Sequence, residues 1–136
     1  MKKELRAYIE CELRDYHKTL SDIANLRDNL LNESPSPPDG MPRGGGTTSD
    51  PTFKRAARLI TCRQLEYMCR AVEAIAAALD RLPPEKVRLV ELKYWVSPQT
   101  LTDYGIAHEL PCSVQTFYNW RNEICNLIAK ELGMAL

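Results

Sequence analysis

Apolar residues recur at every third or fourth position along residues 2–32, with charged side chains between them and neither Gly nor Pro. Because this spacing places the apolar side chains on one helical face, it predicts one long amphipathic helix of roughly 45 Å, at about 1.5 Å per residue. The apolar positions are Leu5, Ile9, Leu13, Tyr16, Leu20, Ile23 and Leu30.

A second long helix is predicted over residues 52–82. Asp50 followed by Pro51 is a start signal, since Asp caps helix N-termini and Pro suits the first helical position. Inside the helix, apolar residues alternate steps of three and four, which is a heptad pattern. We expect this seam to pack on the first helix in an antiparallel hairpin, and homodimerisation through the seam is the alternative. The seam consists of Leu65, Met68, Val72, Ile75, Leu79 and Leu82.

Residues 33–51 separate the two helices and hold five prolines and four glycines. This composition cannot continue a helix, so it predicts a long loop or linker. A structureless connection of this length is uncommon inside a compact domain, and two explanations stay open: a functional segment or a disordered one.

Two shorter helices are predicted before residue 111. Pro83-Pro84 ends the second long helix and starts the next, which extends over residues 84–95. After the break at Ser97-Pro98, either Thr100 or Thr102 can cap a helix that reaches about residue 110, and Thr100 has Asp103 three positions on as a capping-box partner.

Pro111-Cys112 then forms a turn, Ser113 caps a last helix that continues to Leu132, and Gly133 is a stop signal. No β-type alternation appears, so the predicted fold class is all-α: two long helices, arranged as a coiled-coil-like hairpin, followed by a helix-turn-helix domain. The predicted segments are 1–32 (N-terminal helix), 33–51 (Pro/Gly-rich linker), 52–82 (second helix with the heptad seam) and 83–136 (helix-turn-helix domain).

The stretch LTDYGIAHELPCSVQTFYNW, residues 101–120, has the spacing of a helix-turn-helix. Two helices that cross steeply need a small residue where their backbones approach and apolar residues in the wedge between them. Ala107 fits the first role. The wedge residues are Ile106, Leu110, Val114, Phe117 and Trp120.

The last helix of this motif carries an uncharged polar face. Gln115, Asn119 and Asn122 point outward when Val114 and Phe117 point inward, and amides can pair bidentately with adenine. A solvated surface without a reading role is the alternative. The candidate DNA-binding residues are Thr102, Ser113, Gln115, Thr116, Tyr118, Asn119, Arg121 and Asn122.

Positive charge lies outside this face, although the whole chain has a formal net charge of zero. Residues 51–82 hold six basic and three acidic side chains, whereas residues 100–136 hold two basic and four acidic ones. If nucleic acid is the partner, the attraction for phosphate should come from a basic flank. The candidate flank residues are Lys54, Arg55, Arg58, Arg63, Arg88 and Lys93.

Other functional classes find no support in the sequence. The five cysteines form no C-x-x-C pair, and we expect reduced thiols that lie mostly in the core. His17 and His108 stand apart from possible metal partners, and Gly44–Gly46 lacks the context of a phosphate loop, so we expect no enzyme activity, metal or cofactor. No apolar run suggests a membrane span, and the expected location is cytoplasmic.

A family resemblance rests on several segments in order. LPPEKVRLVELKYW, PQTLTDYGIAHEL and SVQTFYNWRNEICNLIAKELG, together with SPSPPDGMPRG, SDPT and ELRDYHKT, resemble the RinA-type phage transcriptional regulators of Gram-positive bacteria and their prophages. The likeness covers nearly the whole chain, from about Leu5 to Gly133. The C-terminal part is also similar to the promoter-reading region 4 of bacterial sigma factors.

The resemblance implies a reading helix over residues 113–124, a supporting helix over 102–110 and a leading helix over 85–94. Val114, Gln115 and Asn119 stand where related helices commonly carry Arg or Lys, and Pro111 stands where Gly is common. It also implies an activator of phage late genes, for packaging or morphogenesis, that binds double-stranded DNA and works with the host RNA polymerase. Affinity would then come from the basic flank, from a second copy or from the polymerase.

Two functional hypotheses follow. In the first, the chain is a sequence-specific transcription activator whose long helices form a homodimer, a higher oligomer or a polymerase contact. In the second, it is a helical adaptor of a phage, which binds other proteins without reading DNA. Alanine substitutions at Gln115, Asn119 and Arg121 would separate the two.

Overall fold

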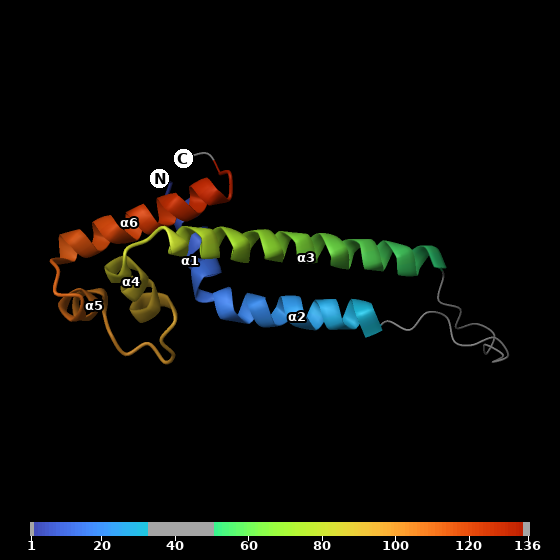
Figure 1. Ribbon diagram of the computed structural model, residues 1–136, viewed down its shortest axis with the longest axis horizontal. Helices are drawn as coiled ribbons and strands as arrows, with labels where there is room; N and C mark the ends of the chain where they lie inside the picture. Colours follow the sequence, from blue (N-terminus) through green and yellow to red (C-terminus); the bar gives the residue numbers. More distant parts are fainter. Residues whose placement is uncertain (1, 33–50, 135–136) are drawn as a thin grey trace. The chain divides into compact units, whose positions relative to one another are not determined.

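The structure is a computed structural model that describes residues 2–32 and 51–134, and these form six α-helices without any strand. The all-α class is therefore confirmed for this part of the chain. Residues 33–50 of the predicted linker, and with them the predicted cap Asp50, lie outside the described residues. The helices are α1 (Lys3–Arg14), α2 (Tyr16–Asn32), α3 (Pro51–Asp80), α4 (Pro84–Tyr94), α5 (Asp103–Glu109) and α6 (Val114–Glu131) (Figure 1).

The chain divides into two compact units. Unit 1 consists of residues 1–17 and 70–136, and unit 2 of residues 18–69. The division falls after His17 in α2 and after Cys69 in α3. Segments 1–32, 33–51, 52–82 and 83–136 stay a prediction of how the chain is organised.

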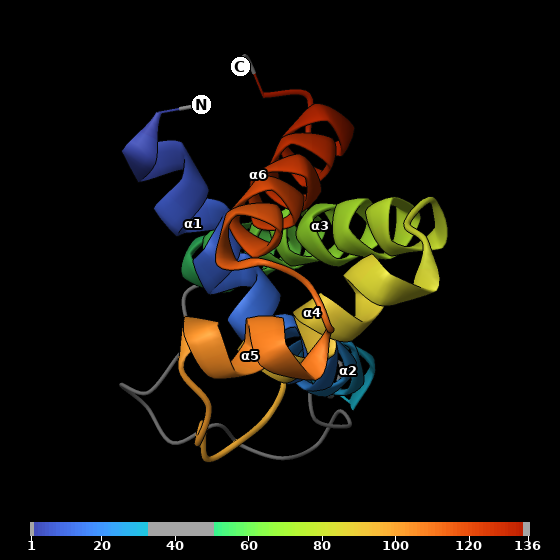
Figure 2. The ribbon, with the colours of Figure 1, turned by 90° about the vertical axis from the view of Figure 1, so that its left-hand side faces the viewer.

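Unit 1 has a hydrophobic core centred on α6, which contacts α1, α4 and α5 (Figure 2). Phe117, Ile124 and Ile128 on one face of α6 are fully buried. They pack with the buried faces of the neighbouring helices, because each helix carries apolar residues at intervals of three or four. The partners include Ile9 and Leu13 of α1, Ile75 and Ala78 of α3, Leu89, Val90 and Tyr94 of α4, and Ile106 and Ala107 of α5.

The prediction of one uninterrupted helix over residues 2–32 is wrong, because the chain turns at Asp15 between α1 and α2. The indole Nε1 of Trp95 donates a hydrogen bond to the carbonyl of Leu13 at 2.9 Å. In a continuous helix this carbonyl would accept from the amide of His17. The rings of Tyr16 and His17 pack on Trp95 instead, with centroids 5.5 and 4.7 Å away.

The heptad seam of α3 is used inside the chain. Val72 and Ile75 are buried, and Leu79 and Leu82 pack against the core of unit 1. Leu65 and Met68, which belong to unit 2, are half-buried.

Unit 2 contains the α2 segment 18–32 and the α3 segment 51–69, which lie side by side (Figure 1). Arg27 Nη2 of α2 donates to the sulfur of Cys69 in α3 at 3.3 Å. Six side chains from both helices line a cavity of about 340 Å³. Ile23 is the one buried apolar side chain among the described residues of this unit.

Several local signals are confirmed. Gly133 has φ +75° and ends α6, with its amide donating to the Lys130 carbonyl and the amide of Met134 donating to the Ala129 carbonyl.

The expectation of mostly buried thiols is wrong: Cys125 is buried, Cys11 is exposed and the other three are half-buried. None of the helices within residues 2–32 and 51–134 is long and apolar enough to cross a membrane.

Candidate nucleic-acid interface

Helices α5 and α6 are joined by a short turn. Thr102 caps α5, its Oγ1 accepting from the amide of Gly105 at 3.2 Å, so Thr100 is not the cap. At the other end of α5, the amide of Cys112 donates to the carbonyl of Ala107 at 3.1 Å. No non-glycine residue of the described chain has a positive φ, and Pro111 therefore fits this turn without strain.

Ser113 caps α6, as predicted. Its Oγ accepts from the amide of Thr116 at 3.0 Å and donates to Thr116 Oγ1 at 2.8 Å. Ser113 itself is exposed, so the first turn of α6 faces solvent at a helix N-terminus, where backbone amides favour phosphate.

The residues predicted to form the wedge lie in the hydrophobic core of unit 1 or pack against it. Ile106, Ala107, Leu110 and Phe117 are buried, whereas Val114 is only half-buried but packs against this core. Trp120 is likewise half-buried and packed on the core. Burial of this face fixes which side of α6 is left to solvent.

The exposed side of α6 carries an amide pair. Gln115 Nε2 donates to Asn119 Oδ1 at 3.1 Å, one helical turn along, and both residues are exposed. Asn122, on the same face, and Thr116 beside it are half-buried. The hydrogen bond restrains both side chains, which reduces the conformational entropy that they lose when a partner binds.

Arg121 lies over the ring of Tyr118, with its Cζ 4.8 Å from the ring centroid. Its Nη2 donates to Asn122 Oδ1 at 3.4 Å, and its Nε is buried without a hydrogen-bond partner in the described chain. Both Arg121 and Tyr118 are half-buried. A guanidinium stacked in this way is held in place while it remains able to donate to a phosphate or a guanine.

Lys93 has a different environment from the one expected of a flank residue. Its Nζ is 2.8 Å from Asp103 Oδ1, its side chain is 14% exposed, and it lies 5.6 Å from the ring centroids of Tyr94 and Phe117. The ion pair ties α4 to the first turn of α5. Gln99 reinforces the same junction, because its Nε2 donates to the carbonyls of Leu92 and Lys93.

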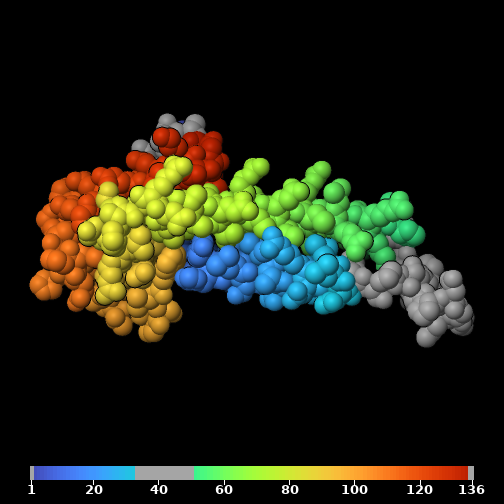
Figure 3. All heavy atoms as spheres, viewed as in Figure 1, coloured from blue at the N-terminus to red at the C-terminus, as the bar shows by residue number. Residues whose placement is uncertain are grey.

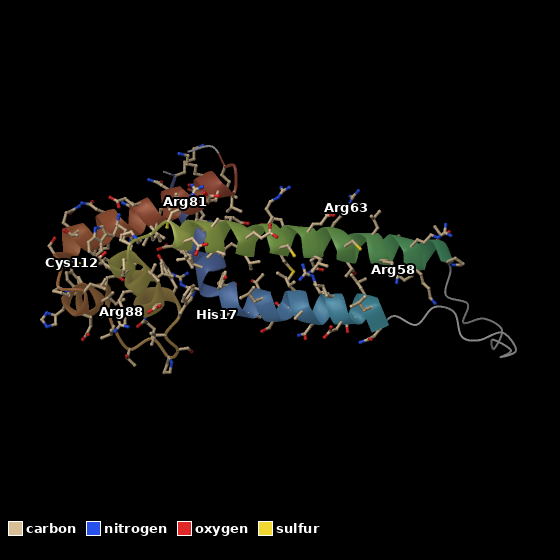
Figure 4. The ribbon with its side chains drawn as sticks, viewed as in Figure 1. His17, Arg58, Arg63, Arg81, Arg88 and Cys112 are labelled. Carbon is tan, nitrogen blue, oxygen red and sulfur yellow. The ribbon has the colours of Figure 1, made fainter. Side chains whose placement is uncertain are left out.

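Three other cations of unit 1 also lie close to carboxylates. Lys86 pairs with Glu123, and Arg81 Nη1 lies 2.7 Å from Glu131 Oε1. Arg88 is exposed, and its Nη1 lies 3.8 Å from Glu91 Oε2. The remaining flank candidates, Lys54, Arg55, Arg58 and Arg63, are exposed residues of unit 2. Arg58 lines the cavity between α2 and α3, whereas Arg63 points away from α2 (Figure 4).

Sequence analysis missed two features of this surface. Tyr104 in α5 is 68% exposed, and its hydroxyl can donate to phosphate. The available signal was its position two residues before the apolar Ile106, which places the two side chains on opposite sides of a helix. The Gln115–Asn119 hydrogen bond was also missed, although a separation of four is the known spacing for such pairs on a helix.

No group of three His, Cys, Asp or Glu side chains that could hold a metal occurs within residues 2–32 and 51–134. Comparison of the chain with protein-family models, with curated proteins and with solved structures finds no match.

Proposed function

We propose that the chain is a sequence-specific DNA-binding activator of phage or prophage late genes, as its resemblance to RinA-type regulators implies. In this proposal α5 and α6 form a helix-turn-helix, α6 is the reading helix, α4 is the leading helix, and α2 and α3 form a helical hairpin. The observation that carries the proposal is the exposed amide pair on the face of α6 opposite its buried side.

The amide pair has the chemistry of an adenine reader. With Gln115 Nε2 bonded to Asn119 Oδ1, the Gln115 oxygen remains an acceptor and the Asn119 nitrogen a donor. The opposite assignment of the two amides also leaves one donor and one acceptor. Adenine presents one acceptor, N7, and one donor, N6, in the major groove, so the pair complements an A·T base pair.

Phosphate contacts would come from the rim of this face. Ser113 with the first turn of α6, the stacked Arg121, Tyr118 and the exposed Tyr104 offer donors of the kind that position a protein on the DNA backbone. Lys93 is left out of this set because Asp103 already neutralises it. Arg88 and the cations of unit 2 remain candidates for additional attraction.

The late-gene role and the action with host RNA polymerase rest on the family resemblance and on the likeness to sigma region 4. They predict that purified chain and host polymerase together raise transcription from a late promoter of the encoding phage. Transcription in vitro with and without the chain measures this directly.

The decisive experiment is footprinting of the full chain on DNA from the phage or prophage that encodes it. We expect protection of discrete sites with a central A·T pair, and a loss of affinity of at least tenfold in the Q115A/N119A variant, since each good base contact contributes about 1–3 kcal/mol. The N25A/N32A variant is the matched control, because it removes two exposed amides from α2.

A chain that protects no site, or a Q115A/N119A variant that protects as well as the parent, would contradict the reading-head assignment. The first result favours the second candidate function, a helical adaptor of a phage. That alternative has an observation of its own, namely the exposed apolar side chains of unit 2 such as Phe53 and Ile60.

A further inference from the structure

Helix α1 brings positive charge to the side of α6. The two helices are in direct contact and lie beside each other in Figure 2. Ile9 and Leu13 of α1 share the hydrophobic core of unit 1 with Ile124 and Cys125 of α6. Because α1 and α6 stand at opposite ends of the described chain, no local pattern in the sequence links the charges of α1 to the surface of α6.

The charged residues of α1 are divided between two sides of the helix. Successive residues of a helix are rotated by about 100°, so the buried Ile9 and Leu13 separate a basic side from an acidic side. On the acidic side Glu12 is hydrogen-bonded to Tyr8. The basic side carries Lys3, Arg6, Glu10 and Arg14, and the acidic side carries Glu4 and Glu12.

The basic side of α1 is the side next to α4 and α6. Glu10 Oε1 accepts the hydrogen bond of the Tyr94 hydroxyl at 2.8 Å. Burial raises the pKa of the Cys125 thiol on α6 to about 12, and the charge of Glu10 adds to this, whereas the charges of Arg121 and Arg6 oppose it. Charges shift a pKa in this way when they are nearby. Arg6 of α1 therefore lies close to the part of α6 that carries Arg121.

Cys125 also shows where α1 lies relative to the exposed amides. Cys125 and Ala129 are buried, whereas Asn122 is half-buried. Asn122 stands three positions before Cys125, which places it about 60° around α6 in the direction of Asn119. Helix α1 thus flanks the face with Gln115 and Asn119 along its Asn122 edge. Helix α6 reaches the surface of unit 1 in Figure 3.

The two edges of this face differ in charge. On the edge away from α1, Glu123 pairs with Lys86 of α4, so these two charges cancel. On the α1 edge stand Arg121 and, on the neighbouring helix, Arg6. The α1 edge is therefore the basic one.

Two cations of α1 are available to a partner at this edge. Lys3 is exposed, Arg6 is half-buried, and neither forms an ion pair with any carboxylate of residues 2–32 and 51–134. Arg14, in contrast, lies over the ring of Tyr94, with its Cζ 5.7 Å from the centroid. We call Lys3 and Arg6 the α1 cations.

We propose that the α1 cations bind backbone phosphates of the duplex whose bases α6 reads. This inference rests on the proposed function and adds what the reading helix lacks, since α6 has only Arg121 and Lys130 as cations. Contacts from Lys and Arg to phosphates position a protein on DNA, while contacts to base edges specify the sequence. In unit 1 the first role falls to α1 and the second to α6.

Fluorescence anisotropy of the full chain on a duplex of arbitrary sequence tests the α1 cations apart from base reading, because binding through phosphates is independent of sequence. Each phosphate contact contributes about −0.9 to the slope of log affinity against log salt, so K3Q/R6Q should reduce the magnitude of the slope by about 1.8. The fall in affinity between about 50 and about 200 mM salt then becomes about twelvefold smaller than in the parent.

Two variants control for net charge and for packing. K18Q/R70Q removes the same two residue types from exposed positions of α2 and α3, and it should keep the slope of the parent. K3R/R6K keeps both charges, so it should also keep the slope even though it changes the half-buried side chain of Arg6. Circular dichroism checks that all variants retain their helix content.

The outcomes separate this inference from the proposed function. A footprint in the parent with an unchanged slope in K3Q/R6Q, or with an equal loss in K18Q/R70Q, would overturn the role of the α1 cations and leave sequence reading intact. A slope that depends on the α1 cations without any protected site would support the phosphate contacts and contradict sequence reading. A parent that binds no duplex even at low salt would overturn both.

Discussion

The hydroxyl of Tyr94 donates to Glu10 Oε1 at 2.8 Å inside unit 1, where the side chain of Tyr94 is 7% exposed. Burial raises the pKa of Tyr94 well above its ordinary value, and the nearby Cys125 and Glu10 add to this effect. Burial, followed by the charge of Glu10, also raises the pKa of Cys125 to about 12. Tyr94 and Glu10 lie 84 positions apart in the sequence, so no local pattern links the two.

These raised pKa values predict a loss of stability in alkali. The native state keeps both protons at pH values where the unfolded chain has lost them, so the stabilisation is complete below about pH 9 and declines as pH rises from there towards 12. Tyr94→Phe removes one of the two groups. We expect it to lower the free energy of unfolding at neutral pH by about 1 kcal/mol through the lost hydrogen bond, and to make the alkaline decline shallower.

Urea unfolding monitored by circular dichroism between pH 7 and pH 11 measures both effects. Tyr104→Phe is the matched control, because Tyr104 is 68% exposed and should leave the curve unchanged. An alkaline decline as steep in Y94F as in the parent would show that Tyr94 does not titrate with unfolding.

At the scale of the helices, the sequence predicted best where the signals are local. Pro84 starts α4, Ser113 caps α6, and Gly133 ends it, each at the residue expected. The break at Asp15 could not be predicted, because the apolar spacing continues through it. At this break the indole N–H of Trp95, which is distant in sequence, donates a hydrogen bond to the carbonyl of Leu13.

The cap of α6 can be separated from its proposed role at phosphate. Ser113→Ala should destabilise the chain by about 1 kcal/mol, whereas Ser113→Asn and Ser113→Asp should keep the cap and the stability. For DNA, Ser113→Asp should bind much more weakly than Ser113→Asn, because it adds a negative charge where a phosphate is expected. Thermal unfolding and fluorescence anisotropy with a footprinted site measure the two properties.

Ser21→Asp is the control for a change of net charge, because Ser21 is exposed on α2. Equal DNA affinity of S113D and S113N would mean that no phosphate lies near the start of α6. In that event the amide pair could still read bases, since it lies further along the helix.

Across the whole molecule, the formal net charge of zero says little about DNA binding, because ion pairs within the chain already neutralise some of its cations. Lys86, Lys93 and Arg81 each pair with a carboxylate inside unit 1. The sequence identified the uncharged face of α6 correctly as exposed at Gln115 and Asn119. It could not tell which cations are already neutralised, because the partners of Lys86 and Arg81 are remote in sequence.

Salt dependence then separates affinity from specificity. The logarithm of the binding constant should fall only shallowly with the logarithm of salt concentration, because each phosphate contact contributes about −0.9 to the slope and the cations of α5 and α6 are only Arg121 and Lys130. The K54Q/R55Q/R63Q variant should reduce the magnitude of the slope by about 0.9 for each contact that it removes. In contrast, Q115A/N119A should lower affinity at every salt concentration and leave the slope unchanged.

Fluorescence anisotropy titrations across a salt series measure these slopes, with Lys18→Gln as the control for loss of an exposed cation that pairs with Asp22. Sedimentation under the same conditions verifies that the variants share one oligomeric state. An unchanged slope in K54Q/R55Q/R63Q would remove unit 2 from the phosphate contacts. The attraction for phosphate would then come from the α1 cations, from Arg88, from Arg121 stacked on the Tyr118 ring, or from a bound polymerase. DNA titrations of the K3Q/R6Q, R88Q and R121Q variants, with and without polymerase, would distinguish these sources.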